Sequence, residues 1–184
     1  MSTEEPSQEN LQRIEASDLI RGFLDKYKFL HEYRLQKLIF FADLFAAEKY
    51  GERLTDTDFM PFMYGSYSDD VSNVLQELEE NPDVSSKTDM HHGKTVTAYV
   101  GDSVDTSDLN DEVVEIIEQV HTVTNSKSNE ELAQASKDSW LYEETEYAEE
   151  MNFREYAEKV RDGEIESDIE RFFPHIDETA SSVS

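Results

Sequence analysis

The organising element of this chain is encoded by Leu35-Gln36-Lys37-Leu38-Ile39-Phe40-Phe41-Ala42-Asp43. Apolar residues recur there at helical spacing and continue to Tyr50, and Gly51 then supplies a C-terminal stop. Apolar side chains also occur outside a single stripe, at Phe40, Phe41 and Leu44. The pattern therefore predicts a helix over residues 32–50 that packs on more than one side and lies at the centre of the fold.

Further helices are predicted on both sides of this central one. Upstream, Ser17-Asp18 can cap a helix whose apolar residues recur as far as Tyr27. Downstream, helix starts are predicted at several places, and a final helical stretch precedes Pro174. These starts are Ser68-Asp69-Asp70, the vicinity of Asp108, the capping box Ser128-Asn129-Glu130-Glu131, and Asn152.

A change of period marks a β element. Residues 95–100 are rich in β-branched and aromatic side chains, and residues 84–88 can pair with them across a turn near Gly93. Residues 59–64 can form a short extended segment, with Pro61 at an edge. The sequence thus predicts a mainly α (α+β) fold, a single domain of about six helices with one small β-hairpin or sheet.

One domain with short tails is the organisation that a length of 184 residues favours. We expect a flexible acidic segment over residues 1–16, a folded domain over residues 17–173 and a disordered tail over residues 174–184. No stretch approaches about 18 consecutive apolar residues, so no membrane span is predicted. The N-terminus is acidic and lacks the apolar core of a signal peptide, which favours a cytoplasmic protein.

The net charge of −27 is extreme, with 43 Asp and Glu against 16 Lys and Arg. Two explanations remain open. The acids can form a solvated surface adapted to high intracellular salt, as in a halophilic protein, because salt screens their repulsion. Alternatively, they can form a face that binds a basic partner or mimics nucleic acid. Their spread through nearly every segment favours salt adaptation.

The sequence offers no set of residues that is typical of catalysis or metal binding. Cysteine is absent, which excludes disulfides, thiolate catalysis and cysteine-ligated metals. The six glycines form no phosphate-binding loop, and neither a G-x-S-x-G nor an H-E-x-x-H motif is present. Residues 89–93 contain two adjacent histidines, but neighbouring side chains in a turn rarely converge on one ion. We therefore predict no enzyme, no cofactor and no metal.

A spaced set of residues runs from the central helix to the single tryptophan. It consists of Lys37, Leu38, Phe41, Ala42, Asp43, Tyr50, Gly51, Pro61, Tyr64, Gly65, Ser128, Leu132 and Trp140. This set resembles the core pattern of the SocA-like antitoxins, the Panacea domain family, and the resemblance extends over about residues 18–160. Two positions depart from the pattern. Ser66 replaces a proline, and Ser136-Lys137 occupies a stretch where the family often has a histidine.

The resemblance implies a mostly helical domain with a small sheet that acts as an antitoxin in a toxin–antitoxin or phage-associated defence locus. Such a protein is a protein–protein interaction module that neutralises a cognate toxin by direct contact, or an adaptor that delivers the toxin to a protease. Its partners are then the toxin and, in the adaptor mode, a protease or chaperone. The candidate partner-binding residues are Lys37, Asp43, Tyr64, Gly65 and Trp140.

The same residues have structural interpretations of their own. Gly51 and Gly65 fit backbone positions with positive φ. Asp43 lies on an apolar helix and is expected to accept hydrogen bonds from a buried loop. For Tyr64 and Trp140, a core position and an exposed binding anchor both remain open, and the core position is favoured.

An alternative function is a DNA-binding transcriptional regulator that acts on its own operon. Lys26, Lys28, Arg34 and Lys37 form a local concentration of positive charge, and they flank a helix–turn–helix-like junction at Phe29-Leu30-His31. Phosphate contacts supply most of the affinity of such proteins. This signal is weak against a net charge of −27, so protein binding is favoured.

Overall fold

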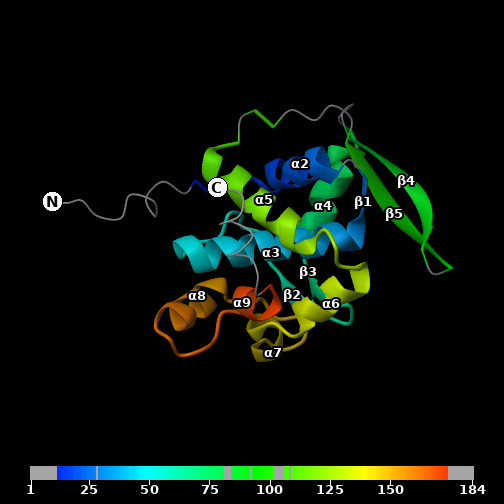
Figure 1. The fold of residues 1–184 in the computed structure, drawn as a ribbon. Coiled ribbons are helices and arrows are strands. Elements are labelled where there is room, and N and C mark those ends of the chain that lie inside the picture. The colour runs from blue at the N-terminus through cyan, green and yellow to red at the C-terminus, as the bar shows by residue number, and fades with distance from the viewer. Residues whose placement is uncertain are drawn as a thin grey trace.

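The computed structural model describes residues 12–27, 29–80, 84–91, 93–101, 106–107 and 109–173. Within these ranges the chain forms eight helices and five strands (Figure 1). The helices are α2 (Ala16–Tyr27), α3 (Glu32–Tyr50), α4 (Asp69–Leu78), α5 (Asp111–Thr124), α6 (Asn129–Lys137), α7 (Trp140–Glu144), α8 (Phe153–Arg161) and α9 (Asp168–Phe172). The strands are β1 (Phe29–His31), β2 (Met60–Phe62), β3 (Gly65–Tyr67), β4 (Val84–His91) and β5 (Lys94–Gly101). The predicted fold class, mainly α with small antiparallel sheets, is confirmed.

Helix α3 is the centre of the molecule because apolar residues cover its whole circumference. Every residue from Leu35 to Ala47 is buried. Helices α2 and α5 pack against it on one side, and α6 and α8 pack on the other (Figure 1). Gly51 ends the helix in the left-handed conformation, with a φ of 79°, and its N–H donates to the Ala47 carbonyl oxygen at 2.9 Å. The predicted central helix and its stop are confirmed.

An aromatic cluster joins the early and late parts of the chain. The ring of Phe40 on α3 lies edge-on to Phe59, with ring centroids 5.5 Å apart, and to Phe153 of α8, with centroids 5.7 Å apart. Phe41, on the same helix, lies edge-on to Phe173 at 5.5 Å. All of these rings are buried, so the C-terminal quarter of the chain completes the core that α3 begins.

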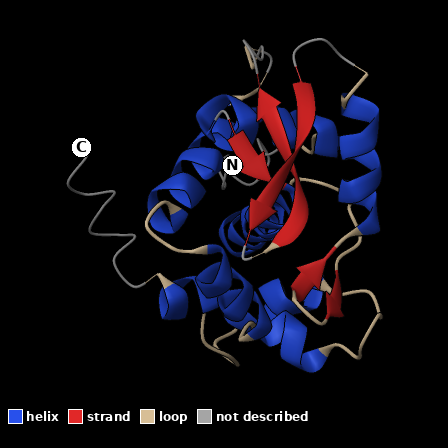
Figure 2. Ribbon diagram, turned by 90° about the vertical axis from the view of Figure 1, so that its right-hand side faces the viewer, coloured by secondary structure: helices blue, strands red, loops and turns tan. Residues whose placement is uncertain are grey.

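A three-stranded antiparallel sheet lies on one side of the helices, in the order β1-β5-β4. The predicted hairpin forms its main part, with Val84 opposite Gly101 and His91 opposite Lys94. The hairpin extends away from the helical body in Figure 1, and in Figure 2 it lies in front of the helices. The helix–turn–helix-like junction predicted at residues 29–31 is wrong. These residues form strand β1, because their backbone pairs with β5 and the facing pair Leu30 and Tyr99 is buried.

Strands β2 and β3 form a second antiparallel pair. Strand β3 packs against α3, and Lys37 in the N-terminal half of α3 binds its backbone. Pro61 lies opposite Ser66, and Phe62 lies opposite Gly65. Pro61 lacks an N–H to donate, which suits a two-stranded sheet in which every strand is an edge. Residues 60–62 were expected to be extended, and they are, but their pairing with β3 was not predicted.

Side-chain caps explain where several helices begin. Ser68 and Asn152 accept hydrogen bonds from the amides of Val71 and Glu155, and Ser128 forms the predicted capping box with Glu131. These three helix starts are confirmed. Two others are shifted. The side chain of Asn110 accepts from the Val113 amide, so α5 begins at Asp111, and α2 begins at Ala16, which places Ser17 and Asp18 in its first turn.

The eight helices in the described ranges exceed the predicted count because residues 140–144 and 168–172 each form a short separate helix. None of the helices in the described part of the chain is long and apolar enough to cross a membrane. Residues 1–11 and 174–184 lie outside the described ranges, so the prediction of a flexible segment over 1–16 is untested for residues 1–11, and the tail over 174–184 stays a prediction. Residues 12–16 are described, and Ala16 is the first residue of α2.

Candidate functional site

Lys37 of α3 is a buried cation that holds strand β3. Its side chain is only 2% exposed, and its Nζ donates to the carbonyl oxygen of Ser66 at 3.0 Å. Burial, and to a smaller extent the positive charge of Lys137, lowers the pKa of Lys37 to about 8. The ammonium group therefore positions the backbone of the β2–β3 hairpin from inside the protein.

Two neighbouring polar side chains fix the same segment, and neither was among the predicted site residues. Gln36 exchanges two hydrogen bonds of 2.9 Å with the backbone N–H and carbonyl of Ser68. Ser136 of α6 accepts from the Ser66 amide at 3.1 Å. The role of Gln36 could have been predicted from the sequence, because it is a polar residue within an apolar helix, as Asp43 is. The role of Ser136 could not have been predicted, since its partner lies 70 residues earlier in the chain.

Gly65 allows this close approach of α3, α6 and the hairpin. Its φ is +109°, which confirms the predicted positive φ. A Cβ atom at this position would lie 2.4 Å from the Ser136 Oγ, 3.0 Å from the Lys37 Cε and 3.2 Å from the Ala133 carbonyl oxygen. Gly65 is therefore required both by its backbone conformation and by the packing around it.

The turn of the hairpin projects into solvent. Met63 is 65% exposed and Tyr64 is 63% exposed, so the core position favoured for Tyr64 is wrong. Tyr147, 65% exposed in the loop before α8, lies beside the hairpin, with its ring 5.4 Å from that of the half-buried Phe62. We refer to Phe62, Met63, Tyr64 and Tyr147 as the hairpin surface. Among the five predicted partner-binding residues, Tyr64 is thus the exposed one.

Asp43 has the structural role that its position on an apolar helix predicted. It is fully buried and accepts hydrogen bonds from the amides of Leu54 and Thr55, at 2.9 and 3.0 Å, and from the Thr55 hydroxyl at 2.7 Å. Arg53 completes the set with a 2.8 Å ion pair. The carboxylate therefore organises the loop after α3, and the prediction that it accepts hydrogen bonds from a buried loop is confirmed.

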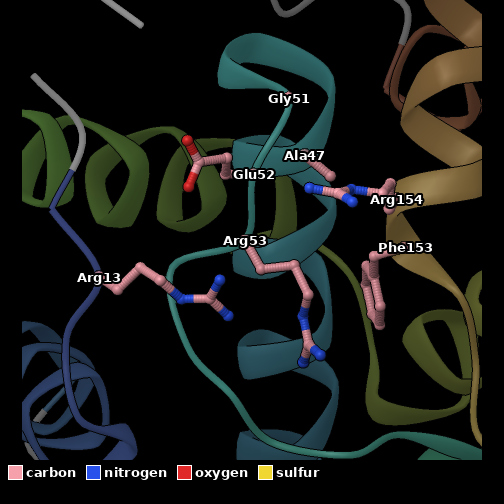
Figure 3. Close-up of a pocket in the computed structure, with 7 residues that line it drawn as sticks. All are labelled: Arg13, Ala47, Gly51, Glu52, Arg53, Phe153 and Arg154. Carbon is pink, nitrogen blue, oxygen red and sulfur yellow. The ribbon is translucent and has the colours of Figure 1, made fainter. Parts of the chain in front are cut away.

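A small arginine-lined cavity of about 120 Å³ lies beside this loop (Figure 3). Arg13, Arg53 and Arg154 approach it from three segments of the chain. Arg53 is held by Asp43 and stacks over the ring of Phe153 at 4.1 Å, while Arg13 donates to the Thr55 carbonyl oxygen at 2.9 Å. Two of the three guanidinium groups, those of Arg13 and Arg53, therefore already bind groups of the protein, which favours a structural role for these arginines over ligand binding.

Trp140 is half-buried at the start of α7. Its ring packs near Tyr156, with centroids 6.0 Å apart, and its backbone N–H donates to the buried Asp168 carboxylate at 2.8 Å. The residue thus joins α7 to α8 and α9. This placement agrees with the favoured interpretation of Trp140 as part of the packed interior.

The three described cations of the DNA-binding alternative, Lys26, Arg34 and Lys37, do not gather into one exposed face. Lys26 forms an ion pair with Glu118 at 2.7 Å, and Arg34 donates to the carbonyl oxygens of Thr124 and Lys127. Lys37 is buried, as described above, and Lys28 lies outside the described ranges. Arg34 therefore joins α3 to the end of α5 and is not presented to phosphate groups.

The described residues contain no group of three or more histidine, aspartate or glutamate side chains placed to hold a metal ion. The cluster at residues 89–93 is only partly covered by this statement, because His92 lies outside the described ranges.

The comparisons with known proteins agree with this pattern of residues. A family model described as antitoxin SocA-like, Panacea domain matches residues 35–141, which run from α3 into α7 and include the whole β2–β3 hairpin. Searches of curated proteins and of solved structures found no match. The family match covers more than half of the chain and contains Lys37, Asp43, Tyr64, Gly65 and Trp140. The chain therefore belongs to the antitoxin SocA-like, Panacea domain family.

Proposed function

We propose that this protein is an antitoxin that neutralises a cognate toxin by direct contact, without chemistry of its own. One observation carries the proposal: the polar residues of the family pattern hold the backbone in place, and an aromatic residue of the pattern projects outward. Lys37 binds the Ser66 carbonyl and Asp43 binds the Leu54 and Thr55 amides, whereas Tyr64 is exposed.

This division of roles suits a binding module. Burying a charged group is unfavourable unless it is paired or hydrogen-bonded. Lys37 and Asp43 both have such partners in the backbone, which supports our proposal that they are structural groups. Their placement instead supports a surface of fixed shape, and a fixed surface loses less conformational entropy when a partner binds.

The experiment is co-expression with the product of the adjacent gene. We expect the neighbouring product alone to arrest growth, and co-expression of this protein to restore it and to yield a stable complex on size-exclusion chromatography. Rescue without a complex would contradict neutralisation by direct contact. Absence of both toxicity and binding in the adjacent-gene pair would count against the antitoxin function itself.

Delivery of the bound toxin to a protease is the second mode that we propose to test. In that mode the steady-state level of the toxin falls when this protein is present and recovers when the protease is removed. In simple neutralisation the toxin level stays constant or rises. A gel shift of upstream DNA by the free protein would instead favour the regulatory alternative.

A further inference from the structure

Half of the large apolar side chains that are exposed in the described part of the chain lie at one place. Six such residues are exposed there: Phe29, Met63, Tyr64, Met90, Val114 and Tyr147. Met63, Tyr64 and Tyr147 belong to the hairpin surface, and the other three lie on β1, β4 and α5. Single exposed apolar residues need no explanation, but a grouped set of this kind is typical of a binding site.

The loop that carries Tyr147 is fastened to the hairpin. The amides of Ala148 and Met151 donate to the carbonyl oxygens of Pro61 and Phe59 at 3.1 and 2.8 Å. The Tyr142 hydroxyl donates to the Phe62 carbonyl oxygen at 2.6 Å. Together with the hydrogen bonds of Lys37 and Ser136 to β3, these contacts hold both strands from opposite sides.

Ala148 also has a strained backbone. Its φ of +65° is the positive value found for a residue other than glycine in the described ranges. Such a conformation is unfavourable by about 1–3 kcal/mol and persists only where the surroundings determine it. The hydrogen bond of the Ala148 amide to Pro61 and the contact of the Tyr147 ring with Phe62 maintain this conformation, so we regard the hairpin surface as preorganised for binding.

On the side of the loop that carries Tyr147, the surroundings of the hairpin surface are strongly acidic, whereas Lys37 and Lys137 lie on the β3 side. Residues 138–153 contain no lysine or arginine, and the exposed side chains there include Glu143, Glu144, Glu146, Glu149 and Glu150. A hydrogen bond with the Asp58 carboxyl group, together with the repulsion between the two charges, raises the pKa of Glu150. Negative charge is therefore crowded at this edge, and a cation that binds there relieves repulsion.

We infer that the hairpin surface docks a cationic segment of the partner polypeptide, with arginine or lysine side chains that stack on Tyr64 and Tyr147 and pair with the surrounding glutamates. Guanidinium groups bind both aromatic faces and carboxylates, so this combination of side chains fits them well. Identifying the owner of the segment as the toxin rests on the proposed function.

Charge also selects against other occupants. A nucleic acid carries the same sign of charge as this surface and is repelled by it. A second copy of the chain would bring another net charge of −27 into contact with the same glutamates. The cationic polypeptide segment is the occupant for which the apolar and the acidic side chains both form favourable contacts.

The two exposed methionines provide a direct test by NMR. Met63 lies in the hairpin turn and is 65% exposed, while Met90 lies on β4 and is 62% exposed. We would label the methionine methyl groups with ¹³C, assign these two resonances with Met63→Leu and Met90→Leu, and add the adjacent-gene product. We expect the Met63 resonance to shift or broaden and the Met90 resonance to stay unchanged.

A second titration uses a synthetic peptide of alternating arginine and leucine, with an alternating glutamate and leucine peptide as control. If the adjacent-gene product binds by calorimetry but leaves Met63 unchanged, the inferred surface is overturned and the antitoxin function stands. If that product does not bind, the antitoxin function fails for the pair, and the titration with the arginine–leucine peptide then tests the inferred surface by itself. A shift of the Met63 resonance alone supports the inferred surface, and equal shifts of the Met63 and Met90 resonances overturn it.

Matched variants test the contributions of shape and charge. Tyr64→Ala should weaken binding of the adjacent-gene product roughly tenfold or more, whereas Val114→Ala on α5 should leave it unchanged. Glu144→Gln with Glu146→Gln should reduce the affinity and its dependence on salt more than Glu77→Gln with Glu80→Gln, which removes the same charge at the end of α4. Equal effects within either matched set would contradict docking at this surface.

Discussion

Gly65 has a positive φ, and a Cβ atom added to it would also meet close neighbours. A matched substitution at another glycine can separate these two effects. Gly163 also has a positive φ, of 76°, but nothing lies within 4 Å of a Cβ built there. We expect Gly163→Ala to lower the free energy of unfolding by about 1 kcal/mol, and Gly65→Ala to lower it by about 1–3 kcal/mol more. Urea denaturation of both variants measures the difference. Equal losses would show that the contacts with Ser136 and Lys37 are readily relaxed.

The lowered pKa of Lys37 predicts a dependence of stability on pH. In the unfolded chain the amine keeps its proton up to about pH 10.5, whereas in the folded protein it loses the proton near pH 8. Between these values the unfolded state binds more protons, so the contribution of Lys37 to stability increases with pH.

We therefore expect the free energy of unfolding of the parent to rise by about 2 kcal/mol relative to Lys37→Met between about pH 7.5 and pH 9.5. Denaturation curves of the two proteins across this range give the value, and other titrating groups cancel in the comparison. A ¹³Cε resonance of Lys37 that titrates near pH 10.5, as an exposed lysine does, would rule out the explanation.

Individual residues differ in how far their roles could be predicted from the sequence. Asp43 was placed correctly because an ionised side chain within an apolar helix needs local hydrogen-bond donors, and the following loop supplies them. Lys37 and Tyr64 were not, because their burial depends on a carbonyl group of β3 and on the direction of a turn. Ser136 and Ala148 act through partners 70 or more residues away, which periodicity does not report.

At the scale of elements, the short helix α9 is held by a buried network centred on Asp168. This carboxylate accepts from the Trp140 amide at 2.8 Å and from Arg171 at 2.6 Å, and its own amide donates to the Tyr156 hydroxyl. The Tyr156 hydroxyl in turn donates to Glu48 of α3. Burial raises the pKa of Asp168 to about 6, and the hydrogen bonds offset part of this effect.

Between about pH 4 and pH 6 the folded state retains a proton on Asp168 that the unfolded chain has lost, so the contribution of this residue to stability falls as the pH rises. We expect the parent to lose about 2 kcal/mol relative to Asp168→Asn over this range. Chemical denaturation at a series of pH values tests this, and a constant difference between the two proteins would contradict it.

Elements with a strong local signal were predicted, and those that depend on distant pairing were missed. The β4–β5 hairpin was found because residues 95–100 are rich in β-branched and aromatic side chains and the segment that pairs with them is adjacent in the chain. Strand β1 has only three residues, and it is extended because β5, about 70 residues later, supplies its partners. Its position between two helices made the same residues look like a helix–turn–helix junction.

For the whole molecule, the balance of 43 acids against 16 bases predicts a strong dependence on salt. We expect the unfolding midpoint to rise as NaCl increases from about 0.05 M to about 1 M, since the screening length falls from more than 10 Å to about 3 Å. Thermal unfolding followed by circular dichroism measures the midpoint. A neutral osmolyte that raised it equally would assign the gain to exclusion from the surface and not to screening.

The position of α3 has a consequence for synthesis on the ribosome. The ring of Phe40 is covered by Phe59 and Phe153, and the ring of Phe41 is covered by Phe173, so the core around this helix is complete only after residue 173 has been translated. A nascent chain halted in its final quarter therefore exposes apolar surface of α3 to chaperones and proteases. Premature termination should yield fragments that proteases degrade quickly. Only chains translated to the end of the domain should then accumulate.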